Sequence, residues 1–179
     1  MSVPLLAKEG TGEVVSLTPY ADPLVRKLIT TYKYGSARCL EDAFRSLLER
    51  YAAAIGKPTW TGMEDLTIVP VPASERRMRE RGFDHAAMLA GLIRESWAPQ
   101  AKLETPLARV KHTLSNAKLE DERARKGNVL GAFEATRPVS GAILLVDDVY
   151  TTGATVEECI RVLKHAGASG VFVLTFAKG

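Results

Sequence analysis

The segment 142–168, AILLVDDVYTTGATVEECIRVLKHAGA, constrains the fold more than any other part of the chain. Residues 143–146 are apolar without interruption, which is typical of a strand buried on both faces in a parallel sheet. Residues 155–166 carry apolar side chains at helical spacing and precede Gly167, a common helix stop. A strand that passes through a short turn into an amphipathic helix predicts an α/β fold.

The rest of the chain continues this alternation. Apolar runs predict further strands over 66–71, 103–110 (interrupted by Pro106) and 171–176, and helical periodicity predicts helices over 22–34, 40–55, 83–97 and 119–126. Such an order predicts a central parallel sheet flanked by helices, with ligands bound beyond the carboxyl ends of the strands. We expect one compact domain, in which residues 1–62 form an N-terminal helical segment and residues 63–179 form the core.

Composition sets the broad class of the protein. The chain has 179 residues, of which 46% are hydrophobic and 25% charged, as in soluble globular proteins. No apolar stretch is long enough for a bilayer and no signal peptide is recognisable, so we expect a cytoplasmic protein with no membrane partner. Cys39 and Cys159 are not in a CxxC pair, which gives no support for structural zinc. The net charge of +3 fits an anionic ligand without establishing nucleic-acid binding.

The turn after the strand at 143–146 is suited to a phosphate. Gly153 permits backbone angles closed to other residues and lets a ligand approach closely. Successive amides in such a turn, and the N–H groups at the start of a helix, attract anions. The hydroxyls of Thr151, Thr152 and Thr155 add hydrogen-bond donors. The motif is not a Walker A loop, because GxxxxGK[ST] is absent.

Two acidic residues, Asp147 and Asp148, lie between this strand and the turn. They would repel a phosphate, so they suit neighbouring hydroxyls such as the diol of a ribose, either directly or through Mg²⁺. A phosphate site beside a diol site describes a ribose 5-phosphate. The alternative is an ordinary strand-to-helix turn in which the Asp and Thr side chains only cap the helix.

A second polar loop follows the predicted strand at 66–71. It contains a run of arginines at Arg76, Arg77, Arg79 and Arg81. Guanidinium groups bind phosphate oxygens in pairs, so the loop suits a pyrophosphate, although a solvated basic loop is the alternative. His85 begins the next predicted helix, where we expect a surface position rather than a role in acid–base catalysis.

The stretch VDDVYTTGAT resembles the phosphoribosyl pyrophosphate signature of type I phosphoribosyltransferases: apolar residues, two acidic residues, then a Thr-Thr-Gly-x-Thr loop. The resemblance implies that fold, with Asp147 and Asp148 at the ribose hydroxyls as catalytic residues and Mg²⁺ ligands. It also implies a ribose-5-phosphate site formed by Val149, Tyr150, Thr151, Thr152, Gly153, Ala154 and Thr155.

Most of residues 17–178 resemble the ComF family of phosphoribosyltransferase-like proteins, which is associated with competence and DNA uptake. The family commonly has Pro-Val-Pro and then Arg-Gly-Phe-Asn-Gln, where this chain has PVP at 70–72 and RGFDH at 81–85. Asp84 and His85 depart from that pattern, which leaves the contacts of this pair open. The resemblance implies a pyrophosphate site formed by Pro72, Ala73, Arg77 and Arg81.

The polar segment 109–133 resembles a ComF stretch that fits this chain at Arg109, Thr113, Leu119, Arg125, Asn128, Ala132 and Phe133, with Asn116 where glutamine is usual. In type I enzymes a flexible loop closes over the pyrophosphate, which makes Arg109, Lys111 and His112 candidates for catalysis. A surface loop without a catalytic residue is the alternative.

The N-terminal residues resemble the ComF stretch before the sheet, and the zinc-binding cysteine cluster with which relatives often begin is absent from this chain. These residues are candidates for a helical hood over the base, near Tyr20, Tyr32, Lys33 and Tyr34. We favour the simpler interpretation that these side chains belong to a core or a dimer surface.

The resemblance implies a phosphoribosyltransferase that binds phosphoribosyl pyrophosphate with Mg²⁺ and transfers the phosphoribosyl group to an unknown base or amine. Catalysis would rest on positioning and electrostatics, with no covalent nucleophile. A homodimer is expected, because dimers are common in such folds. The alternatives are a non-catalytic sensor of phosphoribosyl pyrophosphate and a competence or DNA-uptake accessory protein that binds single-stranded DNA.

Overall fold

The computed structural model describes residues 14–23, 25–26, 37–74, 78–79, 82–111 and 128–179. Its centre is a five-stranded sheet in the order β1-β7-β6-β2-β3. The strands are β1 (Val14–Pro19), β2 (Leu66–Pro70), β3 (Lys102–Leu103), β6 (Ala142–Tyr150) and β7 (Gly170–Lys178). Every neighbouring pair is parallel, which confirms the predicted α/β fold with a central parallel sheet.

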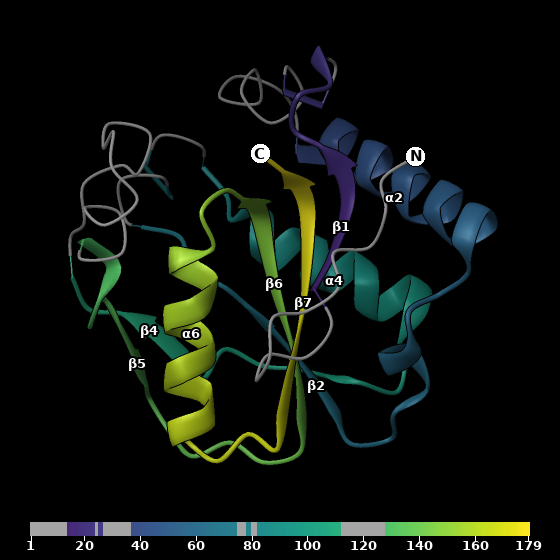
Figure 1. Cartoon of the computed structure of the whole chain (residues 1–179). Helices are drawn as coiled ribbons and strands as arrows, with labels where there is room; N and C mark the ends of the chain where they lie inside the picture. The colour runs from purple at the N-terminus through teal and green to yellow at the C-terminus, as the bar shows by residue number, and fades with distance from the viewer. Residues whose placement is uncertain (1–13, 24, 27–36, 75–77, 80–81, 112–127) are drawn as a thin grey trace.

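Helices cover both faces of this sheet (Figure 1). On one face α4 (His85–Trp97) packs against β2 and β6, and α2 (Ala37–Ile55) packs against α4 and β1. The opposite face carries α6 (Ala154–His165). Beside α6 lies an antiparallel pair, β4 (Leu107–Arg109) and β5 (Phe133–Ala135).

The core is divided into two apolar clusters by the alternation of side chains along β6. Leu144 and Val146 belong to the cluster on the α4 face, and Ile143 and Leu145 belong to the cluster on the α6 face. All four side chains are buried, as expected for a strand in the middle of a parallel sheet. Burial on both faces fixes the register of β6, and therefore the position of the turn that follows it.

The α4 face also contains the chain's two tryptophans. Trp60 lies in a short 3₁₀ helix, Thr59–Gly62, and its ring centroid is 6.0 Å from that of Trp97 at the end of α4. The Trp97 ring is in turn 5.8 Å from the ring of Tyr51 on α2. These aromatic contacts join α2, the 3₁₀ helix and α4 into one layer.

Several strands differ from the sequence prediction, among them β5, which was not expected. β1 was not expected, and its residues pair with β7, from Val14 opposite Val173 to Pro19 opposite Lys178. β6 continues through both acidic residues to Tyr150 instead of ending at Val146, because it goes on pairing with β7. The segment 103–110 is interrupted near Pro106, as predicted, but its two halves belong to separate sheets instead of one strand.

The predicted helices agree with the structure wherever it describes them. Those at 40–55, 83–97 and 155–166 correspond to α2, α4 and α6. Asp22 accepts a hydrogen bond from the Val25 amide at 3.4 Å, as a helix cap would. Most of the predicted helix at 22–34 and all of the one at 119–126 lie outside the described residues. None of the helices within the described ranges is long and apolar enough to cross a membrane.

Candidate functional site at the carboxyl end of β6

The turn from β6 to α6 has a backbone that only glycine adopts easily. Gly153 has φ 80°, in the left-handed region, and is the N-cap of α6. A Cβ at this position would lie 2.8 Å from Cζ of Tyr150 and closer still to its hydroxyl oxygen. The Gly153 carbonyl accepts a hydrogen bond from the Glu157 amide at 2.7 Å, so the helix begins directly after the glycine. Both the backbone angle and the close approach require a residue without a side chain.

All seven residues of the predicted ribose-5-phosphate site surround one small cavity at this turn. Its lining is Asp147, Val149, Tyr150, Thr151, Thr152, Gly153, Ala154, Thr155 and Val156. The volume open to the centre of a water molecule is about 10 Å³, which is about the space of one water. The sequence motif therefore forms one continuous wall in the folded protein.

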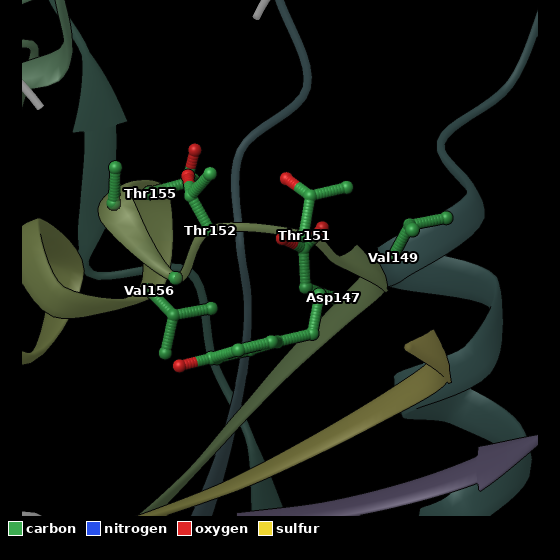
Figure 2. A pocket seen from close by; sticks show the side chains of 9 residues that line it. Asp147, Val149, Thr151, Thr152, Thr155 and Val156 are labelled. Carbon is green, nitrogen blue, oxygen red and sulfur yellow. The ribbon is translucent and has the colours of Figure 1, made fainter. Parts of the chain in front are cut away.

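The threonines of this wall differ in their surroundings (Figure 2). Thr151 is exposed, whereas Thr152 and Thr155 are half-buried. The Thr152 hydroxyl oxygen is itself buried and has no hydrogen-bond partner among the described residues. A buried hydroxyl without a partner costs about 1–3 kcal/mol, so a ligand atom that accepts a hydrogen bond here would be favoured.

The two acidic residues are both buried, each with 8% of its surface exposed, and they point to opposite faces of the sheet. Asp147 lines the cavity on the α6 side, and one of its carboxylate oxygens accepts a hydrogen bond from the Asp148 amide at 2.8 Å. Asp148 lies on the α4 side, where its Oδ2 is 3.7 Å from Nδ1 of His85. The pair therefore flanks the end of β6 from both sides.

Arg109 and Cys159 lie on the same side as Asp147. Burial raises the pKa of the Cys159 thiol well above its usual range, the negative charge of Asp147 raises it further, and Arg109 acts in the opposite direction. The Arg109 guanidinium lies over the ring of Phe133, 5.1 Å from its centroid. The structure thus brings Arg109, a predicted catalytic residue, to the α6 side of the sheet, and it keeps Cys159 as a neutral thiol.

Lys111, another basic catalytic candidate, does not line the cavity. Its ammonium donates a hydrogen bond to the Leu130 carbonyl at 3.1 Å and lies next to Gly131. Glu158 of α6 accepts a hydrogen bond from the Gly131 amide at 2.8 Å and two more from Arg161 at 2.8 and 2.7 Å. The Arg161 hydrogen bonds, then the Gly131 amide and the charge of Lys111, lower the pKa of Glu158.

The loop after β2 lies next to the end of β6. The Val71 amide donates to the Val146 carbonyl at 2.8 Å, and Pro72 and Ala73 follow half-buried. Of the predicted pyrophosphate residues these two are described, whereas Arg77 and Arg81 lie outside the described residues, as does Arg76. Arg79 is exposed.

Asp84 and His85 connect this loop to the site. The Asp84 carboxylate accepts hydrogen bonds from the Ala87 amide at 3.1 Å, as the N-cap of α4, and from the Ala73 amide at 3.3 Å. His85 is only 3% exposed, so the expected surface position is wrong. Helical periodicity could have predicted this burial. His85 precedes Leu89 by four residues and Ile93 by eight, so the three share one helix face, and Leu89 and Ile93 are fully buried.

Several residues named in the sequence predictions lie outside the described part of the chain. His112, Thr113, Asn116, Leu119 and Arg125 of the middle segment lie outside the described residues, as do the hood candidates Tyr32, Lys33 and Tyr34. Tyr20 is described and packs half-buried against the core of the α4 face, beside the C-terminal end of β7. Across the described parts of the chain, no three His, Cys, Asp or Glu side chains are grouped so that they could hold a metal ion.

Comparison with known proteins identifies the family of the chain. No family model matches the chain. Among curated proteins, it is similar to the DNA utilization protein YhgH of Escherichia coli (strain K12), with 32% identity over 165 residues that cover 89% of this chain and 69% of the relative. It is also similar to Competence protein F of Haemophilus influenzae, with 28% identity over 170 residues covering 93% and 72%, and to Competence protein ComFC of Streptococcus pneumoniae, with 27% identity over 168 residues covering 93% and 69%. With its parallel sheet and the turn between β6 and α6, the chain therefore belongs to the ComF family and has an α/β fold of the type I phosphoribosyltransferase kind.

Proposed function

We propose that the protein binds the ribose 5-phosphate part of phosphoribosyl pyrophosphate at the β6–α6 turn. The observation that carries the proposal is the buried Thr152 hydroxyl, which has no hydrogen-bond partner among the described residues and lies directly before the N-terminus of α6. A phosphate supplies the acceptor oxygens that this hydroxyl and the first amides of α6 lack. The helix has 12 residues, long enough for its N-terminus to favour an anion.

The acidic residues determine which part of the ligand lies where. Asp147 and Asp148 are buried at the end of β6. Their negative charges would repel a phosphate, whereas their carboxylate oxygens can accept hydrogen bonds from sugar hydroxyls. The sugar would extend from the turn toward the loop after β2, where Pro72 and Ala73 adjoin the end of β6. Arg77 and Arg81 of that loop are the proposed partners of the pyrophosphate.

We expect the cavity to enlarge when the phosphate binds. Its open volume of about 10 Å³ accommodates one water and is too small for a phosphate group. The ring of Tyr150 lines the cavity and lies against Gly153. We therefore expect the turn to change its conformation with ligand, and the Tyr150 ring to report that change.

Mg²⁺ fits this proposal as an ion shared with the substrate. It is commonly bound by one or two carboxylates together with substrate phosphates, and here Asp147 and Asp148 are the carboxylates available. When bound, Mg²⁺ would reduce the negative charge that develops on the leaving pyrophosphate. The chain's own part is to orient the sugar and to stabilise charge with Arg109 and the arginines of the β2 loop. The acceptor is an unknown base or amine.

Calorimetric titration with phosphoribosyl pyrophosphate and Mg²⁺ tests the binding proposal. The double variant Asp147→Asn/Asp148→Asn should bind at least about tenfold more weakly, since each change replaces a charged acceptor by a neutral amide. Circular dichroism on the same samples checks that the fold is retained. Equal affinity in the wild type and the double variant would contradict the proposal.

Catalysis needs its own experiment. Release of pyrophosphate, measured across a panel of bases and amines, would identify a transferase and its acceptor. Binding without release for any acceptor would support a non-catalytic sensor of phosphoribosyl pyrophosphate. The proposed homodimer is measured separately by sedimentation.

A role in DNA handling is the second candidate, because the relatives are named a DNA utilization protein and competence proteins. The net charge of +3 gives it only general support. Binding of single-stranded DNA measured at several salt concentrations tests it, since the slope counts the phosphates contacted. A flat slope with negligible affinity would remove this candidate.

A further inference from the structure

Of three consecutive residues before and at the start of α4, two contact different parts of the proposed site. Asp84 accepts hydrogen bonds from the Ala73 amide in the β2 loop and from the Ala87 amide in α4. His85 faces Asp148 at the end of β6. Phe83 packs against His85, with ring centroids 4.9 Å apart and planes tilted by 47°. This segment, which we call the 83–85 link, therefore connects the ends of β2 and β6.

The contact between His85 and Asp148 is buried. Their side chains are 2% and 11% exposed, and Nδ1 of His85 lies 3.7 Å from Oδ2 of Asp148. That separation is beyond a hydrogen bond but within electrostatic contact. The Phe83 ring packs against the same imidazole.

We propose that His85 is a positioning residue, which orients the Asp148 carboxylate toward a ribose hydroxyl. The inference rests on the proposed function, because it assigns a partner to an acid that the proposal places at the sugar. His85 is not among the residues that line the cavity at the turn, and its contact with Asp148 is the one on which the inference is built. An N–H group on the ring, 3.7 Å from the carboxylate, would attract the negative oxygen and so favour one orientation of it.

The first test compares two probes, ribose 5-phosphate and inorganic phosphate. His85→Leu should bind ribose 5-phosphate about tenfold more weakly, as expected when a charged group loses its polar neighbour. It should bind inorganic phosphate as the wild type does, because that probe needs only the turn. A purely structural role would lower both affinities together, and this result would overturn the inference.

The second test uses conservative replacement and a control. Asn places an amide N–H close to the position of Nδ1, so His85→Asn should recover most of the affinity for ribose 5-phosphate. The matched control is His165→Leu on the exposed end of α6, where the imidazole contacts only the Arg161 carbonyl in the described structure, and neither affinity should change. Equal loss in His85→Leu and His85→Asn would contradict a role for the N–H group.

A double-variant cycle separates this inference from the proposed function. In an Asp148→Asn background, His85→Leu should cause no further loss of ribose 5-phosphate affinity, because the group it orients is gone. Additive losses would show that His85 acts independently of Asp148. Absence of ribose 5-phosphate binding by the wild type would instead overturn the proposed function, and the inference with it.

Discussion

The two strand-to-helix connections that meet at the site are built in different ways. From β6 to α6 the chain needs only residues 151–153, and the proposed ligand groups there are backbone amides and short hydroxyls. From β2 to α4 it uses residues 71–84, and the proposed ligand groups are long arginine side chains. The short connection has its shape set by Gly153 within the turn, whereas the long one depends on a contact made across the loop, from Asp84 to Ala73.

The segment around Gly131 is held in the same way as the loop after β2. Each of the two helices uses one carboxylate to fix a distant backbone amide: Asp84 before α4 binds the amide of Ala73, and Glu158 in α6 binds the amide of Gly131. A carboxylate can accept several hydrogen bonds at once, so each can serve its own helix and a neighbouring loop. These two loops are thus held by carboxylates of the helices, whereas the turn between β6 and α6 takes its shape from its own glycine.

The largest expected effect comes from changing the short connection. Gly153→Ala places a Cβ in the left-handed region and against Tyr150, which should cost at least about 1–2 kcal/mol of folding free energy. It should weaken ligand binding about a hundredfold, the equivalent of two lost hydrogen bonds to a charged group. Calorimetric titration and urea denaturation measure the two effects.

A glycine in α4, the helix that follows the long connection, serves as the control. Gly91 in α4 has open space around the position of a Cβ, so Gly91→Ala should stabilise the protein by about 1 kcal/mol and leave binding unchanged. If the two alanine variants had similar binding, the turn would not be the phosphate site.

A smaller effect on binding, with none on stability, is expected at Thr152. Thr152→Val removes a buried hydroxyl that has no hydrogen-bond partner in the described structure, so the free energy of unfolding should stay the same or rise slightly. Phosphate affinity should fall about tenfold, because one donor to a charged group is lost. Thr151→Val, at an exposed position of the same turn, is the comparison, and an equal loss there would argue against a special role of the buried hydroxyl.

Variants of Asp84 can distinguish its contact with the loop after β2 from its role as the N-cap of α4. Asp84→Ala removes the N-cap and should cost about 1 kcal/mol. Asp84→Asn caps a helix as well as Asp, but it keeps only one acceptor oxygen and cannot serve both Ala73 and Ala87. We expect Asp84→Asn to keep most of the stability and to lose ligand affinity, as measured by denaturation and titration. Unchanged affinity would show that the loop after β2 does not need this contact.

Glu158 is expected to give the smallest effect, and one that depends on pH. Its pKa in the folded protein is lowered from the ordinary 4.5, so its contribution to stability is complete above pH 4.5 and is lost as the pH falls through the lowered value. Glu158→Gln should therefore cost about 1 kcal/mol at pH 7 and less in acid. Urea denaturation of both proteins at pH 7 and at pH 3 measures the difference, and a constant difference would contradict the charged interaction.

The sequence predicted the parts of the fold that depend on local pattern. The strand at 143–146, the turn and the helix at 155–166 are contiguous, and their apolar spacing and glycine are sufficient to place them. β1 could not be predicted in this way, because its partner β7 lies at the other end of the chain: Ser16 and Thr175 share a hydrogen bond across 159 positions.

The candidate site shows the same limit. The residues of the cavity wall were predicted because they are consecutive in the sequence. The opposite directions of Asp147 and Asp148 follow from the extension of β6 by pairing with β7, which local pattern did not reveal. His85 was placed at the surface because only its position at a helix start was considered, and not its spacing to Leu89 and Ile93.

The arrangement of aromatic residues determines what can be observed by spectroscopy. Both indole rings, Trp60 and Trp97, lie in the layer on the α4 face, and the cluster on the α6 face includes neither. Intrinsic tryptophan emission is therefore a natural reporter of one half of the molecule, while far-ultraviolet ellipticity averages over both halves. Denaturation curves followed by these two signals would coincide if the two faces of the sheet melt together, and would separate if one face loosens first.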